Sequence, residues 1–558
     1  MANVVSTQVQ TAQGTLRGAL TPTGLRAFRA IPYAAPPVGN LRFRAPRPPE
    51  RWTGVRNAMH HGPVAPQRIS QYYSAAGPDT DQSEDCLTLS VLTPAASSPV
   101  LPDAGPSLSP PDAAAPSAMR ASSAMRTSSA MRTSSAMPDA GPAAGSAAPD
   151  ADPAALRPVI VWFHGGAFVR GAGSAPAYAG DALVEHGDAV LVTVNYRLGA
   201  LGFLDFSQFS TPQRVFESNL GLRDMVAALE WVQRNIAAFG GDPSNVTIAG
   251  QSAGATAVTT LMCVPSAAGL FHRAIAQSPA VAAVYGAERA AGWARDFINW
   301  LHTTESLAVD ALLGAPPTEL VAAATRLMAL TQVETPGAMC MSPVVDGDFL
   351  PEHPIDVLAA GRAHPVPLLI GSTKHEGALF ATARPGLLPI SAESINLMFE
   401  ITDPGAQLKV LSAYPGYPSK RARAQLVGDA AFWVPGVHAA QGHATVAPTF
   451  VYRYDFTTAA LNLKGHGATH GTDLLPVFGN LDSSRGRAAT MLGGSEELAG
   501  VSERMQDQWL TFARTGAVSW PVYDDVDRPT KIFSTTDRLI SDPGRERRRA
   551  WDSVATYR

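Results

Sequence analysis

Short apolar runs recur along the chain, each rich in valine, isoleucine or leucine and bounded by Gly, Pro, Asp or Asn. Runs of this length and composition predict strands that are buried on both faces of a sheet. They are CLTLSVLTP (86–94), RPVIVWF (157–163), AVLVTVNY (189–196), NVTIAG (245–250), VPLLIG (366–371) and TFVYRYDF (449–456).

Helical periodicity alternates with these runs. In GLRDMVAALEWVQRNIAAFGG (221–241), apolar side chains recur at the spacing of one helix face, and two glycines then end the helix. The segment 502–516 repeats the pattern, and residues 307–335 and much of 391–441 are also predicted to be helical. The apolar face of the first helix comprises Leu222, Met225, Val226, Leu229, Val232 and Ile236.

Strands that alternate with helices predict an α/β fold, in which a central, mostly parallel, twisted sheet is covered by helices on both faces. The helical stretches inserted late in the chain are predicted to form a cap over the active site. We expect a single domain spanning residues 1–558.

One segment departs from this pattern. From 95 to 155 the chain is rich in Ala, Ser, Pro and Asp, and it contains the six-residue repeat SAMRASSAMRTSSAMRTSSAM (117–137). Such a segment buries too little apolar surface to offset its ordering entropy, so it is predicted to be a disordered insertion within the domain. Met and Arg of the repeat could form a docking motif. Repeat expansion in a tolerant loop is the favoured interpretation, because long loops cost little closure entropy.

Composition narrows the class of protein. With 46% hydrophobic residues, 16% charged residues and a net charge of −4, the chain can bury a large core and carries no basic field for nucleic acid. The arginine-rich stretch GRERRRAWD (544–552) is interpreted as a solvated helix face. Neither a signal peptide nor an apolar run of about 18 residues is evident, so we expect a cytoplasmic protein without a membrane partner.

Cysteine usage supports the same compartment. Cys86, Cys263 and Cys340 are too few and too scattered for a disulfide framework or a metal cluster. They are predicted to be reduced thiols.

One serine stands among very small residues in VTIAGQSAGAT (246–256). The stretch from Gly250 to Gly254 matches G-x-S-x-G, between a predicted strand and a predicted helix. A sharp strand-to-helix turn strains the serine backbone, and it requires small neighbours two residues away on each side. The alternative is a helix start with Ser252 as its N-cap. The flanking strand and helix favour a nucleophile at Ser252.

A second glycine-rich stretch predicts an oxyanion hole. VWFHGGAFVRGAG (161–173) follows a strand and has the H-G-G form. The expected donors are the backbone N–H groups of Gly166, Ala167 and Ala253, with Gly165 shaping the turn. The alternative is a glycine-rich turn without catalytic function.

Several stretches together resemble the type-B carboxylesterase family, the α/β-hydrolases that include cholinesterases and bacterial para-nitrobenzyl esterases. The resemblance covers nearly the whole chain outside the insertion. It rests on FRAIPYAAPPVGNLRFRAPRPPERWTGVRNA, SEDCLTLSV, VNYRLGALGFL, NLGLRDMVAALEWVQRNIAAFGGDPSNVTIAGQSAGA, GLFHRAIAQS, SPVVDGDFLP and WPVYD, which follow in the family's order.

The resemblance implies the rest of a catalytic triad. The family's acid lies in a stretch like GSTKHEGALF, which places it at Glu376, and its histidine in a stretch like ATHGTDLLPVFG, which places it at His470. His466 is a near rival because it also precedes a glycine. His164 belongs to the oxyanion loop and is expected to be structural. The order Ser252, Glu376, His470 agrees with the order of this fold.

The chain also departs from the family. Ala65 stands where many members have a cysteine, so Cys86 is expected to lack a bridge. Gln251 replaces the usual glutamate before the serine, which puts an electrostatic role for that side chain in doubt. Ala30 stands at a usual glycine, a change that we expect to be tolerated. QSPA (277–280) replaces a usual QSG.

The resemblance implies a serine hydrolase that cleaves small-molecule carboxylic esters through an acyl-enzyme, with no metal or organic cofactor. A carbamate or amide hydrolase with the same machinery is an alternative, and a non-catalytic binding member of the fold is another. A monomer or weak homo-oligomer is expected. Phe168 and Trp433 are candidates for pocket walls or for the core.

Overall fold

The computed structural model describes residues 7–68, 80–95, 156–381 and 386–557. Apart from Ala95, the low-complexity segment 95–155 lies outside the described residues. Its disorder and the single domain over 1–558 therefore stay predictions.

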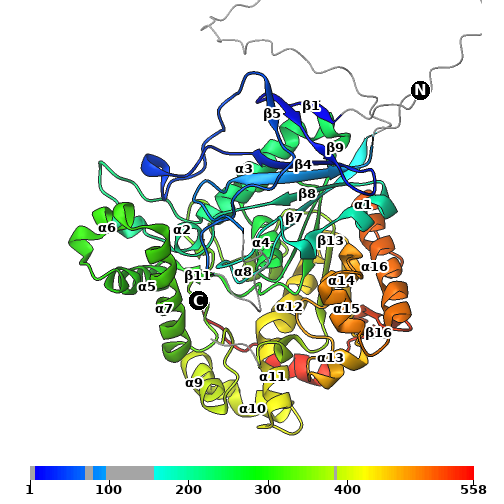
Figure 1. Cartoon of the computed structure of the whole chain (residues 1–558). Helices are drawn as coiled ribbons and strands as arrows, with labels where there is room; N and C mark the ends of the chain where they lie inside the picture. Colours follow the sequence, from blue (N-terminus) through cyan, green and yellow to red (C-terminus); the bar gives the residue numbers. More distant parts are fainter. Residues whose placement is uncertain (1–6, 69–79, 96–155, 382–385, 558) are drawn as a thin grey trace, which may run out of the picture. The chain divides into compact units, whose positions relative to one another are not determined.

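A mixed sheet is the centre of the fold (Figure 1). Its strand order in the described residues is β16-β15-β14-β13-β10-β9-β7-β8-β6-β4-β3. The seven strands from β15 to β8 pair in parallel, and the edge strands pair antiparallel. The strands are β3 (Ala19–Leu20), β4 (Arg26–Pro32), β6 (Thr88–Thr93), β7 (Arg157–Phe163), β8 (Val190–Val194), β9 (Gly241–Gln251), β10 (Arg273–Gln277), β13 (Leu368–Thr373), β14 (Thr449–Tyr454), β15 (Pro529–Phe533) and β16 (Arg538–Ser541).

Every apolar run singled out in the sequence forms a strand of this sheet. One central strand was not predicted by that pattern. β10 has the sequence RAIAQ, in which alanines replace the β-branched residues that mark the other strands, yet it is buried between β9 and β13. Its burial arises from its position in the sheet and not from its own β-propensity.

Helices cover both faces of the sheet, as predicted. Along β7, Val159, Val161 and Phe163 pack into one core with helices α3 (Leu220–Asn235) and α4 (Ala253–Leu261). The alternate residues Ile160 and Trp162 pack into a second core with α16 (Ser495–Thr515). This alternation is the two-residue period of a strand buried on both sides.

The predicted helix ends are also confirmed. All six apolar residues predicted on the first helix face are at most 6% exposed. Left-handed Gly240 and Gly516 follow the helical segments that they were expected to end. No described helix combines the length and the hydropathy that a membrane crossing requires.

The late helices form a layer with a core of its own. It contains α9 (Ala392–Thr402), α10 (Gln407–Ser412) and α11 (Lys420–Gly428), which Figure 1 shows grouped together. Phe399 and Leu426 meet Trp551 of α17 (Arg545–Trp551) in this smaller cluster. The helices predicted within 391–441 are therefore present, and α9 to α11 share this smaller core.

The arginines of α17 do not form the simple solvated face that the sequence suggested. Arg548 is 9% exposed and donates two hydrogen bonds to Asp542. Arg547 pairs with the buried carboxylate of Asp429. The expectation of a solvated face was wrong for these two side chains, because each pairs with a carboxylate. Asp429 lies 118 positions from Arg547 along the chain, and Asp542 lies 6 positions before Arg548.

Candidate active site

Ser252 lies at a strained turn between β9 and α4. Its backbone has φ 58° and ψ −125°, which is unusual for a residue other than glycine. Its N–H donates to the Gln277 carbonyl at 2.9 Å, which fixes the turn to the end of β10. This is the geometry predicted for a nucleophile, and not that of an ordinary helix N-cap, because no capping hydrogen bond from the side chain is present within the described residues.

The two flanking glycines are required by close backbone contacts. A Cβ atom on Gly250 would lie 2.5 Å from the carbonyl carbon of Gly254. A Cβ atom on Gly254 would lie 2.0 Å from the carbonyl oxygen of Phe163. Both distances are far below van der Waals contact, so the glycines of G-x-S-x-G allow the strand, the turn and the helix to pack together.

Glu376 and His470 form a buried pair. The Nδ1–H group of His470 donates to Glu376 Oε2 at 2.6 Å, and the residues are 9% and 2% exposed. Glu376 Oε1 also accepts from the Ser278 hydroxyl and the Thr373 N–H, both at 2.6 Å. Three donors therefore hold a carboxylate that burial would otherwise destabilise.

The other ring nitrogen of His470 faces the serine turn. Nε2 lies 3.1 Å from the side-chain nitrogen of Gln251, so the amide N–H donates to it when Nδ1 carries the ring proton. Phe432 stacks on the imidazole with ring centroids 4.4 Å apart. No hydrogen bond joins the Ser252 hydroxyl to His470 among the described residues, but both side chains line one cavity. In serine hydrolases this contact is often loose before substrate binds.

The oxyanion loop lies against the serine turn. A Cβ atom on Gly165 would lie 3.2 Å from Ser252 Cβ, so the loop backbone approaches the serine closely. Gly166 and Ala167 have φ values of 130° and 55°. These three residues and Ala253 line the same cavity as Ser252, which is the arrangement expected of backbone donors for an oxyanion.

The other two histidines considered in the sequence lie elsewhere. His164 is buried, stacks on Tyr196 with centroids 4.3 Å apart, and pairs through Nδ1 with the Gly165 carbonyl at 2.9 Å. Burial lowers the pKa of His164 to about 4, against the opposing effect of that hydrogen bond. His466 lines a separate basic hollow that does not include Ser252. The structure therefore brings His470 and not His466 to Glu376.

A cavity of about 320 Å³ opens beside Ser252. Its walls are largely apolar and come from the oxyanion loop, from the chain after β13, from the cap and from α14 (Leu474–Phe478). They include Phe168, Leu379, Phe380, Leu387, Phe432 and Leu474. Phe168, one of the two side chains proposed as pocket walls, is among them. Apolar walls around a few converging polar groups are typical of a small-molecule site.

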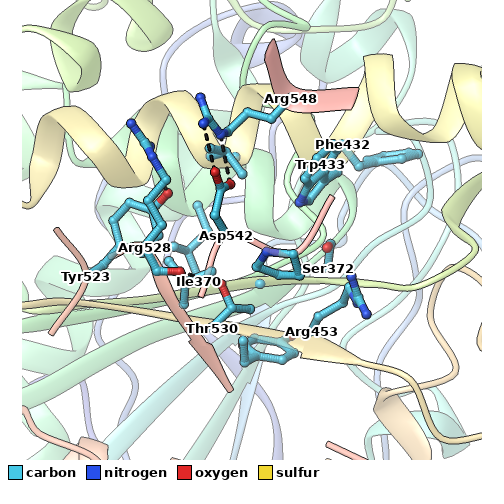
Figure 2. A pocket seen from close by; sticks show the side chains of 16 residues that line it. Ile370, Ser372, Phe432, Trp433, Arg453, Tyr523, Arg528, Thr530, Asp542 and Arg548 are labelled. Atoms are coloured by element: carbon cyan, nitrogen blue, oxygen red, sulfur yellow. Dashed lines mark hydrogen bonds and ion pairs between the residues drawn. The ribbon is translucent and has the colours of Figure 1, made fainter. Parts of the chain in front are cut away.

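Trp433, the other proposed wall, does not line this cavity. It lines a much smaller hollow of about 30 Å³, shown in Figure 2 with the Arg548–Asp542 pair beside it. Its neighbour Phe432 lines both hollows. Of the two interpretations left open for Trp433, its packing against the core of the late helices agrees with a core role and not with a wall of the Ser252 cavity.

Two functional neighbours were not found by sequence reasoning. Ser278 contacts Glu376, and the stacked Phe432 comes from the cap. The signal for Ser278 was available in principle. A serine directly after a central parallel strand lies at the edge where β9 and β13 also end, but β10 was not recognised as a strand.

The fold and this site define a class of protein. A mostly parallel sheet, a strained serine after β9, a carboxylate after β13 and a later histidine paired with it together define an α/β-hydrolase.

Comparison with known proteins identifies the family. The model of the carboxylesterase family matches residues 5–555. The chain is 34% identical to the para-nitrobenzyl esterase of Bacillus subtilis, over 98% of this chain and 97% of that protein. It is 30% identical to the phenmedipham hydrolase of Pseudarthrobacter oxydans, over 92% of each.

Solved structures agree. A thermophilic PNB esterase superposes with a TM-score of 0.78 at 34% identity, covering 97% of this chain and 99% of that one. A carboxylesterase of Geobacillus stearothermophilus superposes with a TM-score of 0.75 at 32% identity, covering 98% and 100%. The chain belongs to the carboxylesterase family and is a carboxylic ester hydrolase. Ester hydrolysis is therefore favoured over the carbamate, amide and non-catalytic alternatives.

Proposed function

We propose that this esterase uses Ser252 as its nucleophile, His470 as its general base and acid, and Glu376 as the group that orients the imidazole. One observation carries the proposal. A buried Glu376–His470 pair lies beside the strained Ser252 turn, and the imidazole and the hydroxyl line one apolar cavity. Such a combination of nucleophile, base and orienting acid activates a hydroxyl that is unreactive by itself.

In the proposed reaction, His470 Nε2 takes the proton of Ser252 as its oxygen attacks the ester carbonyl. The backbone N–H groups of Gly166, Ala167 and Ala253 stabilise the negative charge that develops on the carbonyl oxygen. His470 then gives the proton to the departing alcohol. Water repeats the sequence with His470 as base, which releases the acid and restores the serine.

The charge balance of this cycle depends on Glu376. When His470 becomes an imidazolium, its positive charge is held 2.6 Å from a carboxylate that keeps two further donors. The carboxylate needs no reorganisation during the step, because its partners are already in place.

We also propose that the enzyme works in the cytoplasm as a monomer or weak homo-oligomer on small-molecule esters, with no nucleic-acid or membrane partner. The state of the cysteines supports a reducing compartment. Cys86, Cys263 and Cys340 are all free thiols. Burial raises the pKa of Cys340 to about 11, which keeps it protonated and unreactive.

The experiment is hydrolysis of a short-chain para-nitrophenyl ester by wild type and Ser252→Ala. We expect kcat to fall by at least about 10⁴-fold, with an unchanged unfolding midpoint. Ser342→Ala is the control, because Ser342 does not line the Ser252 cavity and its buried hydroxyl has no hydrogen-bond partner within the described residues. Burst release of nitrophenol by Ser252→Ala would exclude Ser252 as the nucleophile.

A further inference from the structure

Two arginines line the cavity at Ser252 and have no part in the proposed reaction. They are Arg170, which follows the oxyanion glycines, and Arg485 of α15 (Ser484–Thr490). None of the described residues that line this cavity is an aspartate or a glutamate. The described lining of this cavity therefore combines two cationic side chains with largely apolar walls and contains no carboxylate.

Both cations belong to the wall built around the oxyanion loop. A Cβ atom on Gly166 would lie 3.1 Å from Arg170 Cγ, so the stem of this arginine packs against the loop. Arg485 lies within electrostatic range of the buried Tyr178 hydroxyl. Burial raises the pKa of Tyr178, and a hydrogen bond with the Gly165 backbone and the charge of Arg485 oppose the rise.

Arg485 is available to a ligand. Its side chain is exposed, and no ion pair or hydrogen bond joins it to another residue in the part of the chain that the structure describes. Arg487 on the same helix differs from Arg485 in its hydrogen bonding and in its position relative to the cavity. It donates to the Asp482 carbonyl, and it does not line the cavity.

The carboxylates nearest to the reaction do not cancel this charge. Glu376 is 2% exposed and is occupied by His470, Ser278 and Thr373. Asp473 is fully buried and accepts from Gln277 and Tyr452. Neither of them lines the cavity.

We propose that the cavity selects esters that carry a carboxylate on an apolar spacer, with Arg485 as the group that binds this anion. The inference rests on the proposed function of Ser252. An arginine can bind a carboxylate through two parallel N–H donors. The apolar walls hold the spacer, while the ester carbonyl lies at the oxyanion loop.

The test compares kcat/KM for matched pairs of esters at low ionic strength in a pH-stat. Monomethyl adipate against methyl hexanoate places the carboxylate on the acyl side. The butanoate ester of 4-hydroxybutanoate against pentyl butanoate places it on the alcohol side. We expect one of the two anionic esters to exceed its neutral partner, and the pair that does so identifies the side on which Arg485 acts.

Arg485→Ala should lower kcat/KM for the preferred anionic ester by about tenfold and change the neutral ester by less than about twofold. Arg487→Ala should leave both unchanged. Salt at 0.5 M, where the Debye length falls to about 4 Å, should reduce the anionic preference of wild type.

Two failures are distinguishable. If wild type hydrolyses neither neutral nor anionic esters, the proposed function itself is wrong. If it hydrolyses neutral esters but shows no preference in either pair, or if Arg485→Ala and Arg487→Ala have equal effects, only the anion site is overturned. A loss of folding in Arg485→Ala would be detected by its neutral-ester rate, and Arg485→Gln would then replace it with the same expected result.

Discussion

The active site holds two buried histidines whose surroundings differ. His470 faces a carboxylate on one ring nitrogen and the cavity with Ser252 on the other side. His164 lies under the oxyanion loop, stacked on Tyr196 and paired with a backbone carbonyl. Both are less than a tenth exposed, so burial alone does not separate them.

The partner decides what each imidazole can do. In the proposed mechanism, a carboxylate beside Nδ1 stabilises the imidazolium that general-base catalysis produces, and the opposite nitrogen faces Gln251 and the serine turn. The neutral carbonyl partner of His164 opposes the effect of burial only in part, so burial lowers the pKa of His164 to about 4. His164 therefore supports the loop through its stacking and its hydrogen bond, whereas His470 is the histidine that we propose to exchange protons.

The largest effect on kcat is expected when the Glu376 carboxylate beside His470 is replaced. Glu376→Gln keeps the size of the side chain but removes its charge. The amide can face His470 Nδ1 with either its acceptor oxygen or its donor NH2 group, so the ring is no longer held in one tautomer. We expect kcat to fall by about 10³- to 10⁴-fold, as measured with a neutral ester. Glu352→Gln is the control, since Glu352 is an exposed carboxylate paired with Arg362. A loss of less than about tenfold for Glu376→Gln would contradict the role given to this residue.

The second prediction concerns His164 and stability. Its pKa of about 4 in the folded chain lies below the usual 6.5, so the unfolded state binds the proton first as pH falls. The contribution of the uncharged His164 to the free energy of unfolding is fully present above pH 6.5. It is lost as the pH falls from 6.5 to 4, by about 3 kcal/mol in total.

Urea unfolding of wild type and His164→Asn from pH 7 to 4.5 measures this loss. The asparagine variant should lose less unfolding free energy than wild type on acidification. Parallel pH dependences in the two proteins would show that His164 does not bind a proton on unfolding.

A smaller effect is expected from Ser278, which lies behind the pair. Ser278→Ala removes one of three donors from the Glu376 carboxylate, and a hydrogen bond to a charged group is worth about 1.5–3 kcal/mol. We expect kcat to fall about tenfold with little change in KM. Ser342→Ala, a buried serine without such a contact, should leave kcat unchanged. Equal effects of the two variants would refute a positioning role for Ser278.

The smallest effect concerns Gln251, whose amide faces His470 Nε2 at 3.1 Å. Gln251→Glu would place a carboxylate there and favour the protonated imidazole. The acid limb of the profile of kcat/KM against pH should move to higher pH, by about one unit or less. The neutral variant Gln251→Met should leave the limb in place. A limb that does not move in Gln251→Glu would mean that this side chain does not interact with the imidazole.

Local patterns predicted those parts of the fold that local physics determines. The valine- and isoleucine-rich runs became strands, and the glycines of the serine motif proved to be required by contacts of 2.0–2.5 Å. Ala30, which stands where the family usually has glycine, also has a locally determined backbone. It has φ 52° beside a shift of register between β4 and β6, so alanine is accommodated where glycine is usual.

The pair of Glu376 and His470 could not be predicted from periodicity. The two residues are 94 positions apart, and only the return of the chain past the end of β13 brings them together. The resemblance to a family supplied them instead. The walls of the cavity, such as Phe432 and Arg485, come from separate helices whose relative packing leaves no signal along the chain.

The central claim is that Ser252 is the nucleophile activated by the Glu376–His470 pair. The most direct measurement is peptide mapping by mass spectrometry after reaction with a fluorophosphonate at one equivalent per chain. We predict one adduct, on Ser252, formed in parallel with the loss of esterase activity and absent from Ser252→Ala. An adduct on another residue that accompanies the loss of activity, or full esterase activity in a chain modified at Ser252, would contradict it.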